Sequence, residues 1–257
     1  MIDSHVHLDD PRFDEDREAV IARARAAGVD GFVVPGTTRE GWSRIAALAE
    51  SVPGLYPAYG LHPWFMRRHR NDDIEALDRW LDAHPAVAVG ECGLDYHVPD
   101  SDREAQLALF RAQLTLARNH RLPLIVHARK SLDAVLRELR RQGGLEGVLH
   151  SFSGSPQQAQ QAVELGFRLG IAATVGFERA QKLRRVVCEV DESALLIETD
   201  APDQPGPAHR GERNEPAFLP AHLAAMAELR GQPPELLSSR LDENCRKLFR
   251  LERKDDD

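Results

Sequence analysis

Short apolar, β-rich runs alternate along this chain with longer stretches whose apolar residues recur every three or four positions. The short runs predict strands, and the longer stretches predict amphipathic helices that bury one face. Eight strands are expected: Met1–Leu8, Gly31–Pro35, Gly54–Leu61, Ala86–Glu91, Pro123–Ala128, Gly147–Phe152, Arg168–Ala172 and Leu195–Thr199.

Helical stretches follow each of these strands. They are expected at Asp14–Ala27, Arg39–Ser51, Asp72–Ala83, Asp102–Asn119, Ser131–Gln142, Pro156–Leu165, Glu178–Val187, Pro216–Leu229 and Pro234–Arg250. The ends of two of them carry typical signals. Gly28 follows the first helix, and Ser155 before Pro156 is an N-cap followed by a first-turn proline.

This alternation predicts the fold. Strands separated by helices pair in parallel through right-handed crossovers, and eight such units close economically into a (β/α)8 barrel, or TIM barrel. An open doubly wound sheet is the alternative, but no GxGxxG sequence follows an early strand. Length alone permits two small domains, yet no change in composition marks a boundary, so residues 1–257 are expected to form one domain. The long irregular segment Ala201–Glu215 is a candidate functional loop.

Composition narrows the class of protein. Apolar content of 42% and charged content of 29% are ordinary for a soluble globular enzyme. No apolar run is long enough to span a membrane, and only three widely spaced cysteines are present, which favours the cytoplasm. A net charge of −8 argues against extensive non-specific wrapping of nucleic acid but allows a compact phosphate site.

Residues of the types that bind metals recur where the expected strands end, which is where TIM barrels carry their active sites. His5 and His7 are spaced so that a strand would present both on one face. Each of five later ends carries another: His62, Glu91, His127, His150 and Asp200. A single histidine of this kind is more often structural than a ligand, and Glu91 or Asp200 alone could pair with an arginine or cap a loop. The recurrence at six ends therefore favours a metal site.

The motifs around these residues resemble those of one family over almost the whole chain. They are Asp3-Ser4-His5-Val6-His7-Leu8, Gly60-Leu61-His62-Pro63, Gly90-Glu91-Cys92-Gly93-Leu94-Asp95-Tyr96, Val126-His127-Ala128-Arg129, His150-Ser151-Phe152-Ser153-Gly154, Glu198-Thr199-Asp200-Ala201-Pro202 and Arg213-Asn214-Glu215-Pro216. In this order they resemble the TatD-type metal-dependent hydrolases, DNase-like members of the amidohydrolase superfamily.

The resemblance implies a site for two divalent metal ions, with Zn²⁺, Mn²⁺ and Mg²⁺ as the candidates. His5, His7 and Asp200 would hold one ion, His127 and His150 the other, and Glu91 would bridge them. Asp200 would also accept a proton from the attacking water, so Glu91 and Asp200 are the expected catalytic residues. Asp95 and Tyr96 are expected to orient these ligands through hydrogen bonds.

Three residues are candidates for contacting substrate. His62 could meet the scissile phosphate, although a structural histidine is nearly as consistent with the sequence. Arg129 follows His127 by two positions, so strand alternation would aim its guanidinium the same way, against the alternative of a surface salt bridge. Arg213 in the long loop is a similar candidate.

The ligand pattern and the resemblance together predict a hydrolase of phosphodiester bonds. The resemblance implies that it is a TatD-like deoxyribonuclease, acting as a 3′–5′ exonuclease on DNA, and that it is a monomer. One alternative keeps the metals but cleaves a carboxylic ester, amide or lactone. Another is a barrel that binds a metal or ligand without turnover. Two departures from the family pattern, Asp203-Gln204-Pro205-Gly206-Pro207 and His97 after Tyr96, lie in loops expected to choose the substrate.

Overall fold

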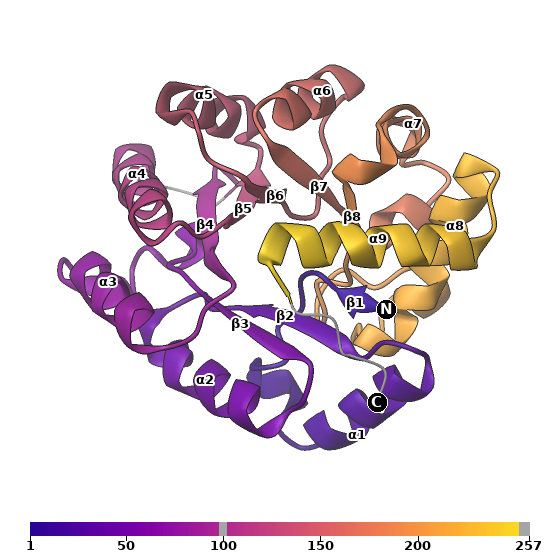
Figure 1. The fold of residues 1–257 in the computed structure, drawn as a ribbon, viewed down its shortest axis with the longest axis horizontal. Coiled ribbons are helices and arrows are strands. Elements are labelled where there is room, and N and C mark those ends of the chain that lie inside the picture. Colours follow the sequence, from indigo (N-terminus) through magenta and orange to yellow (C-terminus); the bar gives the residue numbers. More distant parts are fainter. Residues whose placement is uncertain (98–101, 252–257) are drawn as a thin grey trace.

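Eight parallel strands follow one another around a single sheet in chain order in the computed structural model, which describes residues 1–97 and 102–251 (Figure 1). The first and last strands also meet, because the Ser4 amide donates to the Ile197 carbonyl and the Asp200 amide donates to the His5 carbonyl. The predicted (β/α)8 barrel is therefore confirmed. Its strands are β1 Ile2–Asp3, β2 Gly31–Pro35, β3 Leu55–Tyr59, β4 Ala88–Asp95, β5 Leu124–Arg129, β6 Gly147–Leu149, β7 Phe167–Ile171 and β8 Leu195–Ile197.

Helices surround the sheet and match the expected ones to within a few residues at each end. They are α1 Arg17–Ala26, α2 Trp42–Ser51, α3 Asp73–Ala83, α4 Arg103–His120, α5 Leu132–Gln142, α6 Pro156–Glu164, α7 Gln181–Glu189, α8 Leu219–Arg230 and α9 Pro234–Phe249. Ser155 begins α6 with a capping box, as its sequence predicts: its hydroxyl accepts from the Gln158 amide, and the Gln158 side chain accepts from the Ser155 amide.

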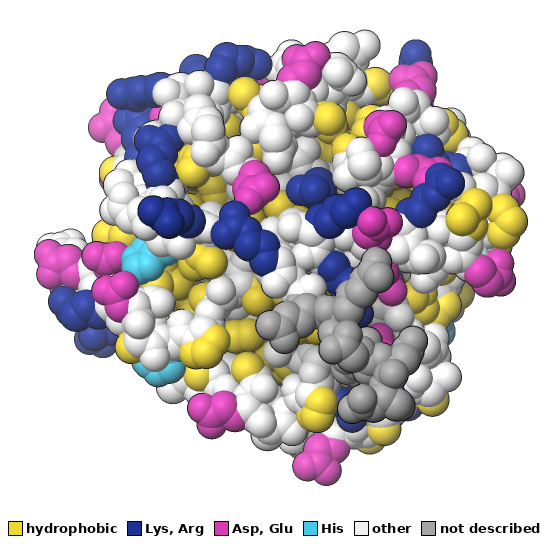
Figure 2. Space-filling view, viewed as in Figure 1, with side chains coloured by type: hydrophobic (Ala, Val, Ile, Leu, Met, Phe, Trp, Pro, Cys, Tyr) yellow, Lys and Arg dark blue, Asp and Glu magenta, His cyan; other side chains and the backbone are white. Residues whose placement is uncertain are grey.

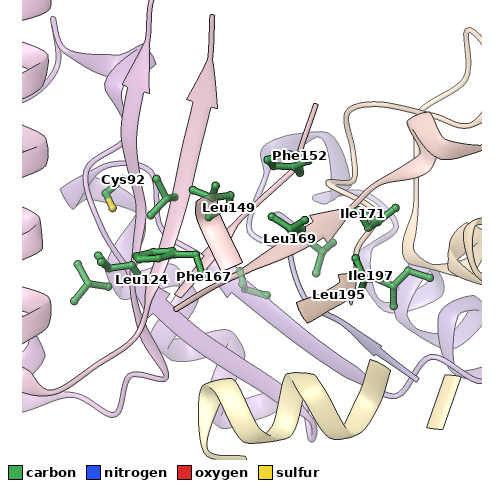
Figure 3. Packing of buried hydrophobic residues seen from close by; sticks show 14 of the residues in the cluster. Cys92, Leu124, Leu149, Phe152, Phe167, Leu169, Ile171, Leu195 and Ile197 are labelled. Atoms are coloured by element: carbon green, nitrogen blue, oxygen red, sulfur yellow. The ribbon is translucent and has the colours of Figure 1, made fainter. Parts of the chain in front are cut away.

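The core has two layers, because neighbouring strand residues point to opposite faces of the sheet. In β8, Leu195 and Ile197 pack outward against the helices, whereas Leu196 faces the barrel interior. Figure 3 shows the outer layer along β5 to β8, including Leu149 and Leu169. In β3, β5, β6 and β8 this alternation continues past the interior residues Ala58, Ile125, Val148 and Leu196 and aims every second residue into the mouth of the barrel.

Helix α9 closes one end of the barrel. Its residues Cys245, Leu248 and Phe249 pack against the interior layer at the amino ends of the strands, and Figure 1 shows α9 crossing in front of them. Figure 2 shows basic and acidic side chains interspersed over this face. The carboxyl ends of the strands therefore form the end that can hold a site. In the described ranges, none of the helices combines the length and apolar character needed to cross a bilayer.

Four expected strands are shorter in the structure, and among them the third, expected over Gly54–Leu61, is β3 Leu55–Tyr59. The first was expected to continue to Leu8, but β1 ends at Asp3 because the chain bends at Ser4 and His5, where the Asp3 carboxylate accepts from the His5 amide at 3.3 Å. β6 and β8 end at Leu149 and Ile197, before their functional residues. The expected single domain over residues 1–257 stays a prediction, and residues 98–101 and 252–257 lie outside the described ranges.

Candidate metal centre

The Glu91 carboxylate lies at the middle of the candidate centre and directs one oxygen to each side. Its Oε2 is 3.4 Å from Nε2 of both His5 and His7. Asp200 completes this group, with Oδ1 at 3.5 Å from His5 Nε2 and 3.6 Å from His7 Nε2. These three side chains come from the first and last strand ends, which the β1–β8 seam holds together.

The other oxygen of Glu91 faces the second group. Oε1 is 2.8 Å from His150 Nε2 and 3.2 Å from His127 Nδ1, and those two imidazole nitrogens are 3.1 Å apart. His150 also stacks on His5, with ring centroids 4.0 Å apart. The structure thus brings together all six residues that the sequence predicts as ligands, from five different strand ends.

A change of register in β4 places Glu91 at this position. Ala88 faces the barrel interior, whereas Cys92 and Leu94 face the outer layer. The pairing of β4 with β5 shifts between Val89 and Cys92, and this irregularity turns Glu91 inward, where its residue is 2% exposed. Strand alternation alone does not predict that orientation.

The spacing of the donor atoms fits divalent cations. Around an ion held at about 2.0–2.1 Å, tetrahedral ligands lie about 3.4 Å from one another and adjacent octahedral ligands about 3.0 Å. The donor atoms of the His5 group are 3.2–3.6 Å apart, and those of the His127 group are 2.8–3.2 Å apart. Neutral imidazoles and carboxylates without thiolates suit Zn²⁺, Mn²⁺ or Mg²⁺.

Electrostatics within the cluster are strongly coupled. Burial alone would raise the pKa of Glu91, but the surrounding imidazoles, led by His62 and His150, hold that pKa well below its usual range. Burial raises the pKa of Asp200 to about 6 and lowers that of His5 well below its usual range. Burial opposes protonation of His7 too, yet the Glu91 carboxylate raises its pKa to about 9. The ionised Glu91 carboxylate therefore favours positive charge beside it at the centre.

A neighbouring acceptor fixes which nitrogen His127 offers to a metal. His127 Nε2 lies 3.1 Å from Asp95 Oδ2, so Nε2 carries a proton and the lone pair of Nδ1 faces Glu91. His150 Nδ1 faces Glu198 Oε1 at 3.6 Å, beyond hydrogen-bond distance, and that oxygen accepts from the Ser151 amide. Asp95 therefore lies where the sequence predicts an orienting residue.

His62 differs from His127 because the nitrogen that faces Glu91 is the one that carries the proton. Its Nδ1 accepts from the Trp64 amide at 3.0 Å, so the proton lies on Nε2, which contacts Glu91 Oε1 at 3.0 Å. A nitrogen that carries a proton cannot be a metal ligand, and His62 therefore acts as a hydrogen-bond donor to Glu91. Burial lowers the pKa of His62 to about 4, which keeps its ring neutral.

Gln204 is a contact of Asp200 that the sequence analysis does not single out. Its amide donates to Asp200 Oδ2 and, at 2.8 Å, to Ser151 Oγ, leaving Asp200 Oδ1 toward the histidines. Asn214 holds the same loop by donating to the Thr199 and Asp203 carbonyls. Asn214 belongs to the motif Arg213-Asn214-Glu215-Pro216, whereas Gln204 belongs to the stretch that departs from the family pattern, so the sequence marked its loop but not its contact with Asp200.

The two candidate arginines lie in different settings. Arg129 is exposed near the mouth, and its guanidinium carbon is 5.9 Å from the centroid of the Trp64 ring. Arg213 instead forms a bidentate ion pair with Asp16, at 2.9 and 2.7 Å, and lies over the Phe13 ring. The structure therefore engages Arg213 with the segment before α1 and does not bring it to Glu91.

Comparisons with known proteins agree with this geometry. The family described as TatD related DNase matches residues 2–250. The chain is 40% identical to the uncharacterized metal-dependent hydrolase YjjV of Escherichia coli over 254 residues, covering 98% of each chain. It is 36% identical to the 3′-5′ ssDNA/RNA exonuclease TatD of Erwinia billingiae, covering 98% of this chain and 99% of that one. The crystal structure of YjjV superposes with a TM-score of 0.93 at 39% identity, covering 98% of each chain.

Proposed function

This chain belongs to the family of TatD-related DNases, and we propose that it removes nucleotides from the 3′ end of single-stranded DNA by metal-dependent hydrolysis. The observation that carries the proposal is the position of Glu91. One carboxylate oxygen faces His5 and His7, and the other faces His127 and His150. A carboxylate shared in this way would suit a two-metal site of the kind that stabilises the attacking and leaving oxygens in phosphodiester hydrolysis.

Two ion sites follow from that arrangement. His5, His7 and Asp200 would hold one divalent ion, His127 and His150 would hold the other, and Glu91 would bridge them. Such a pair, of Zn²⁺, Mn²⁺ or Mg²⁺, supplies activation of a water molecule and neutralisation of charge on the phosphoryl oxygens. The chain's own contribution is to fix the donor atoms, since Asp95 and Glu198 face the remaining nitrogens of the outer imidazoles.

Asp200 is the proposed general base. Its Oδ1 faces the histidines while Gln204 binds Oδ2. Oδ1 is therefore the oxygen that faces the candidate metal centre. A pKa raised to about 6 matches a group that accepts a proton near neutral pH. We further propose that His62 orients Glu91 by donating a hydrogen bond to it, and that Arg129, exposed at the mouth, binds a phosphate of the substrate.

The remaining proposals concern the molecule as a whole. We propose that residues 1–257 act as one domain and that the enzyme is a cytoplasmic monomer. The three cysteines, Cys92, Cys188 and Cys245, are free, which accords with a reducing compartment. Arg213 is bound by Asp16 and supports the loop that carries Asp200. We propose this structural role for Arg213 in place of the substrate contact that the sequence predicts.

A direct test combines metal analysis with one nuclease assay. The parent protein is purified, its metal content measured by elemental analysis, and its activity followed with Mn²⁺ or Mg²⁺ on single-stranded DNA labelled at the 5′ end. We expect successive shortening from the 3′ end. Asp200→Asn should lower the rate by about 10³-fold while the protein retains metal, because the amide keeps one oxygen donor but accepts no proton.

A panel of carboxylic esters, amides and lactones serves as the comparison. Hydrolysis of an ester by the parent with no cleavage of DNA under any metal would contradict the proposal. A metal-loaded parent that turns over neither class would point to a binding barrel instead.

A further inference from the structure

A cavity of about 690 Å³ with basic residues in its walls lies beside the candidate metal centre. Its walls come from the loops that follow β4, β5 and β6 and from the helices after them. Tyr96 is the next residue after Asp95, and Ala128 is the next after His127. The cavity therefore begins where the ligand-bearing strands end, on the outer side of His127. Its volume is within the range that encloses a ligand of nucleotide size.

Three cations line this cavity: Arg103, Lys130 and Arg137. None of them forms an ion pair with another residue in the described ranges, whereas Arg12, Arg111 and Arg213 each pair with a carboxylate. The carboxylate in the wall, Asp133, already accepts from the Gln158 amide at 2.7 Å. Among the described residues, positive charge is therefore in excess in this wall, in a chain whose net charge is −8. Such an arrangement attracts a polyanion.

Aromatic rings accompany the charge. The Arg103 guanidinium carbon lies 4.5 Å from the centroid of the half-buried Tyr96 ring. A second pair, Arg129 over Trp64, stands at the ends of β5 and β3, and Trp64 is 46% exposed. Flat rings combined with guanidinium groups are the surfaces on which proteins stack unpaired bases.

We propose that this cavity binds the nucleotide on the 5′ side of the one being removed, which holds the retained strand during cleavage. The base stacks on Tyr96 and Arg103, and Lys130 and Arg137 bind its phosphates. Trp64 and Arg129 guide the strand from the cavity to the metals. The inference rests on the proposed nuclease function and extends it, because it assigns a single-stranded nucleic acid to a defined path over β4, β5 and β6.

The first experiment removes two charges from the cavity. The double variant Lys130→Gln/Arg137→Gln is compared with Arg140→Gln/Arg141→Gln, which removes two exposed charges from α5 outside the cavity. Binding of a fluorescein-labelled single-stranded 12-mer is followed by anisotropy in EDTA, and hydrolysis is measured on the same oligonucleotide and on bis(p-nitrophenyl) phosphate. The cavity variant should bind the 12-mer at least tenfold more weakly, and its salt slope should fall by about 1.4.

Kinetics separate this role from a general loss of structure. In the cavity variant, kcat/KM for the oligonucleotide should fall about tenfold more than kcat/KM for the small phosphodiester, mainly through KM. Tyr96→Leu should also raise KM for the oligonucleotide about tenfold, and Tyr96→Phe should restore it, because a phenyl ring stacks equally well. The α5 control should retain the affinity and kinetics of the parent.

The outcomes distinguish this inference from the nuclease proposal. If the parent binds the 12-mer through Lys130 and Arg137 but cleaves no phosphodiester, the nuclease proposal fails and the cavity assignment stands. If the parent cleaves DNA and the cavity variant matches it in affinity and KM, the cavity assignment is overturned. Failure of the parent to bind the 12-mer also overturns it.

Discussion

Asp95 decides which nitrogen of His127 faces the cluster. The carboxylate accepts only, so His127 Nε2 must carry the proton and Nδ1 is left to bind a cation. Asp95 also accepts from the His97 amide at 2.8 Å, which fixes the carboxylate itself. The affinity of the centre therefore depends on a residue that touches no ion directly.

We expect Asp95→Asn to weaken metal binding about 10- to 100-fold without unfolding the protein. The asparagine oxygen can still accept from the His97 amide, but its NH2 group can donate to His127 Nε2 and move the imidazole proton to Nδ1. Titration of metal-free protein with Mn²⁺ measures the effect. Asp191→Asn, at an exposed N-cap, is the control and should bind Mn²⁺ as the parent does; equal affinities for all three proteins would refute the role of Asp95.

At the residue scale, the sequence predicted the six candidate ligands because they stand at the ends of apolar runs. It did not predict the contact of Gln204 with Asp200, since that contact depends on the path of an irregular loop. Nor did it reveal that Arg213 is bound by Asp16, because ion pairs between distant segments leave no periodic pattern.

Gly60, directly after β3, packs against the backbone of Gly90 and Glu91 in β4. A Cβ atom on Gly60 would lie 2.6 Å from the Gly90 carbonyl carbon and 2.9 Å from the Glu91 nitrogen. Both contacts are with backbone, which cannot rotate away. Glycine at position 60 is therefore a condition for the position of Glu91 and for the bridge between the two groups of histidines.

Gly60→Ala should reduce the free energy of unfolding by about 1–3 kcal/mol and weaken Mn²⁺ binding, because β4 must shift to admit the methyl group. Urea denaturation of the metal-free protein and a Mn²⁺ titration measure the two effects. The matched control is Gly41→Ala, whose added Cβ has its nearest neighbour at 3.8 Å and should change stability by less than about 0.5 kcal/mol. A Gly60→Ala protein as stable as this control would contradict the argument.

At the scale of elements, periodicity predicted each helix and strand, and local signals predicted the start of α6. The ends of strands were less predictable where side chains compete for the backbone hydrogen bonds between strands. Asp3 accepts from the backbone and bends the chain after β1, and the glycines of Gly90-Glu91-Cys92-Gly93 resemble a strand end although β4 continues to Asp95. The register shift that turns Glu91 inward arises from pairing with β5, which no single segment encodes.

The free energy of unfolding is a property of the whole barrel. The buried side chain of His222 in α8 makes it depend on pH. His222 is 4% exposed, and its Nδ1 donates to the Glu198 carbonyl at 3.1 Å. Burial lowers its pKa to about 4, so the folded protein keeps this ring neutral, whereas the unfolded chain protonates it near pH 6.5. Its contribution to stability is complete above pH 6.5 and is lost as the pH falls toward 4.

Between pH 7 and pH 5, this single group should cost the folded state about 2 kcal/mol. His222→Gln removes the titrating ring while its amide can still donate to Glu198. Urea denaturation in EDTA at the two pH values should therefore show a smaller loss of stability for His222→Gln than for the parent, by that amount. His97→Gln, at an exposed histidine, should behave as the parent does; parallel pH curves for parent and His222→Gln would disprove the assignment.

The alternation of apolar runs was sufficient to predict the barrel, because eight strand–helix units have few ways to bury both faces of a parallel sheet. The cavity formed by the loops after β4, β5 and β6 was not predictable in that way, since its walls meet only when three units stand side by side.

The seam between β1 and β8 also joins residues that are synthesised at different times. His5 is made early, and Asp200 follows 195 positions later, so a ribosome adding roughly 5–20 residues per second needs about 10–40 s between them. Throughout that interval the nascent chain carries His5 and His7 without Asp200, and β1 lacks the contact with β8. An ion site that requires Asp200 can therefore be completed only late in synthesis, and a polypeptide released before that point lacks this ligand.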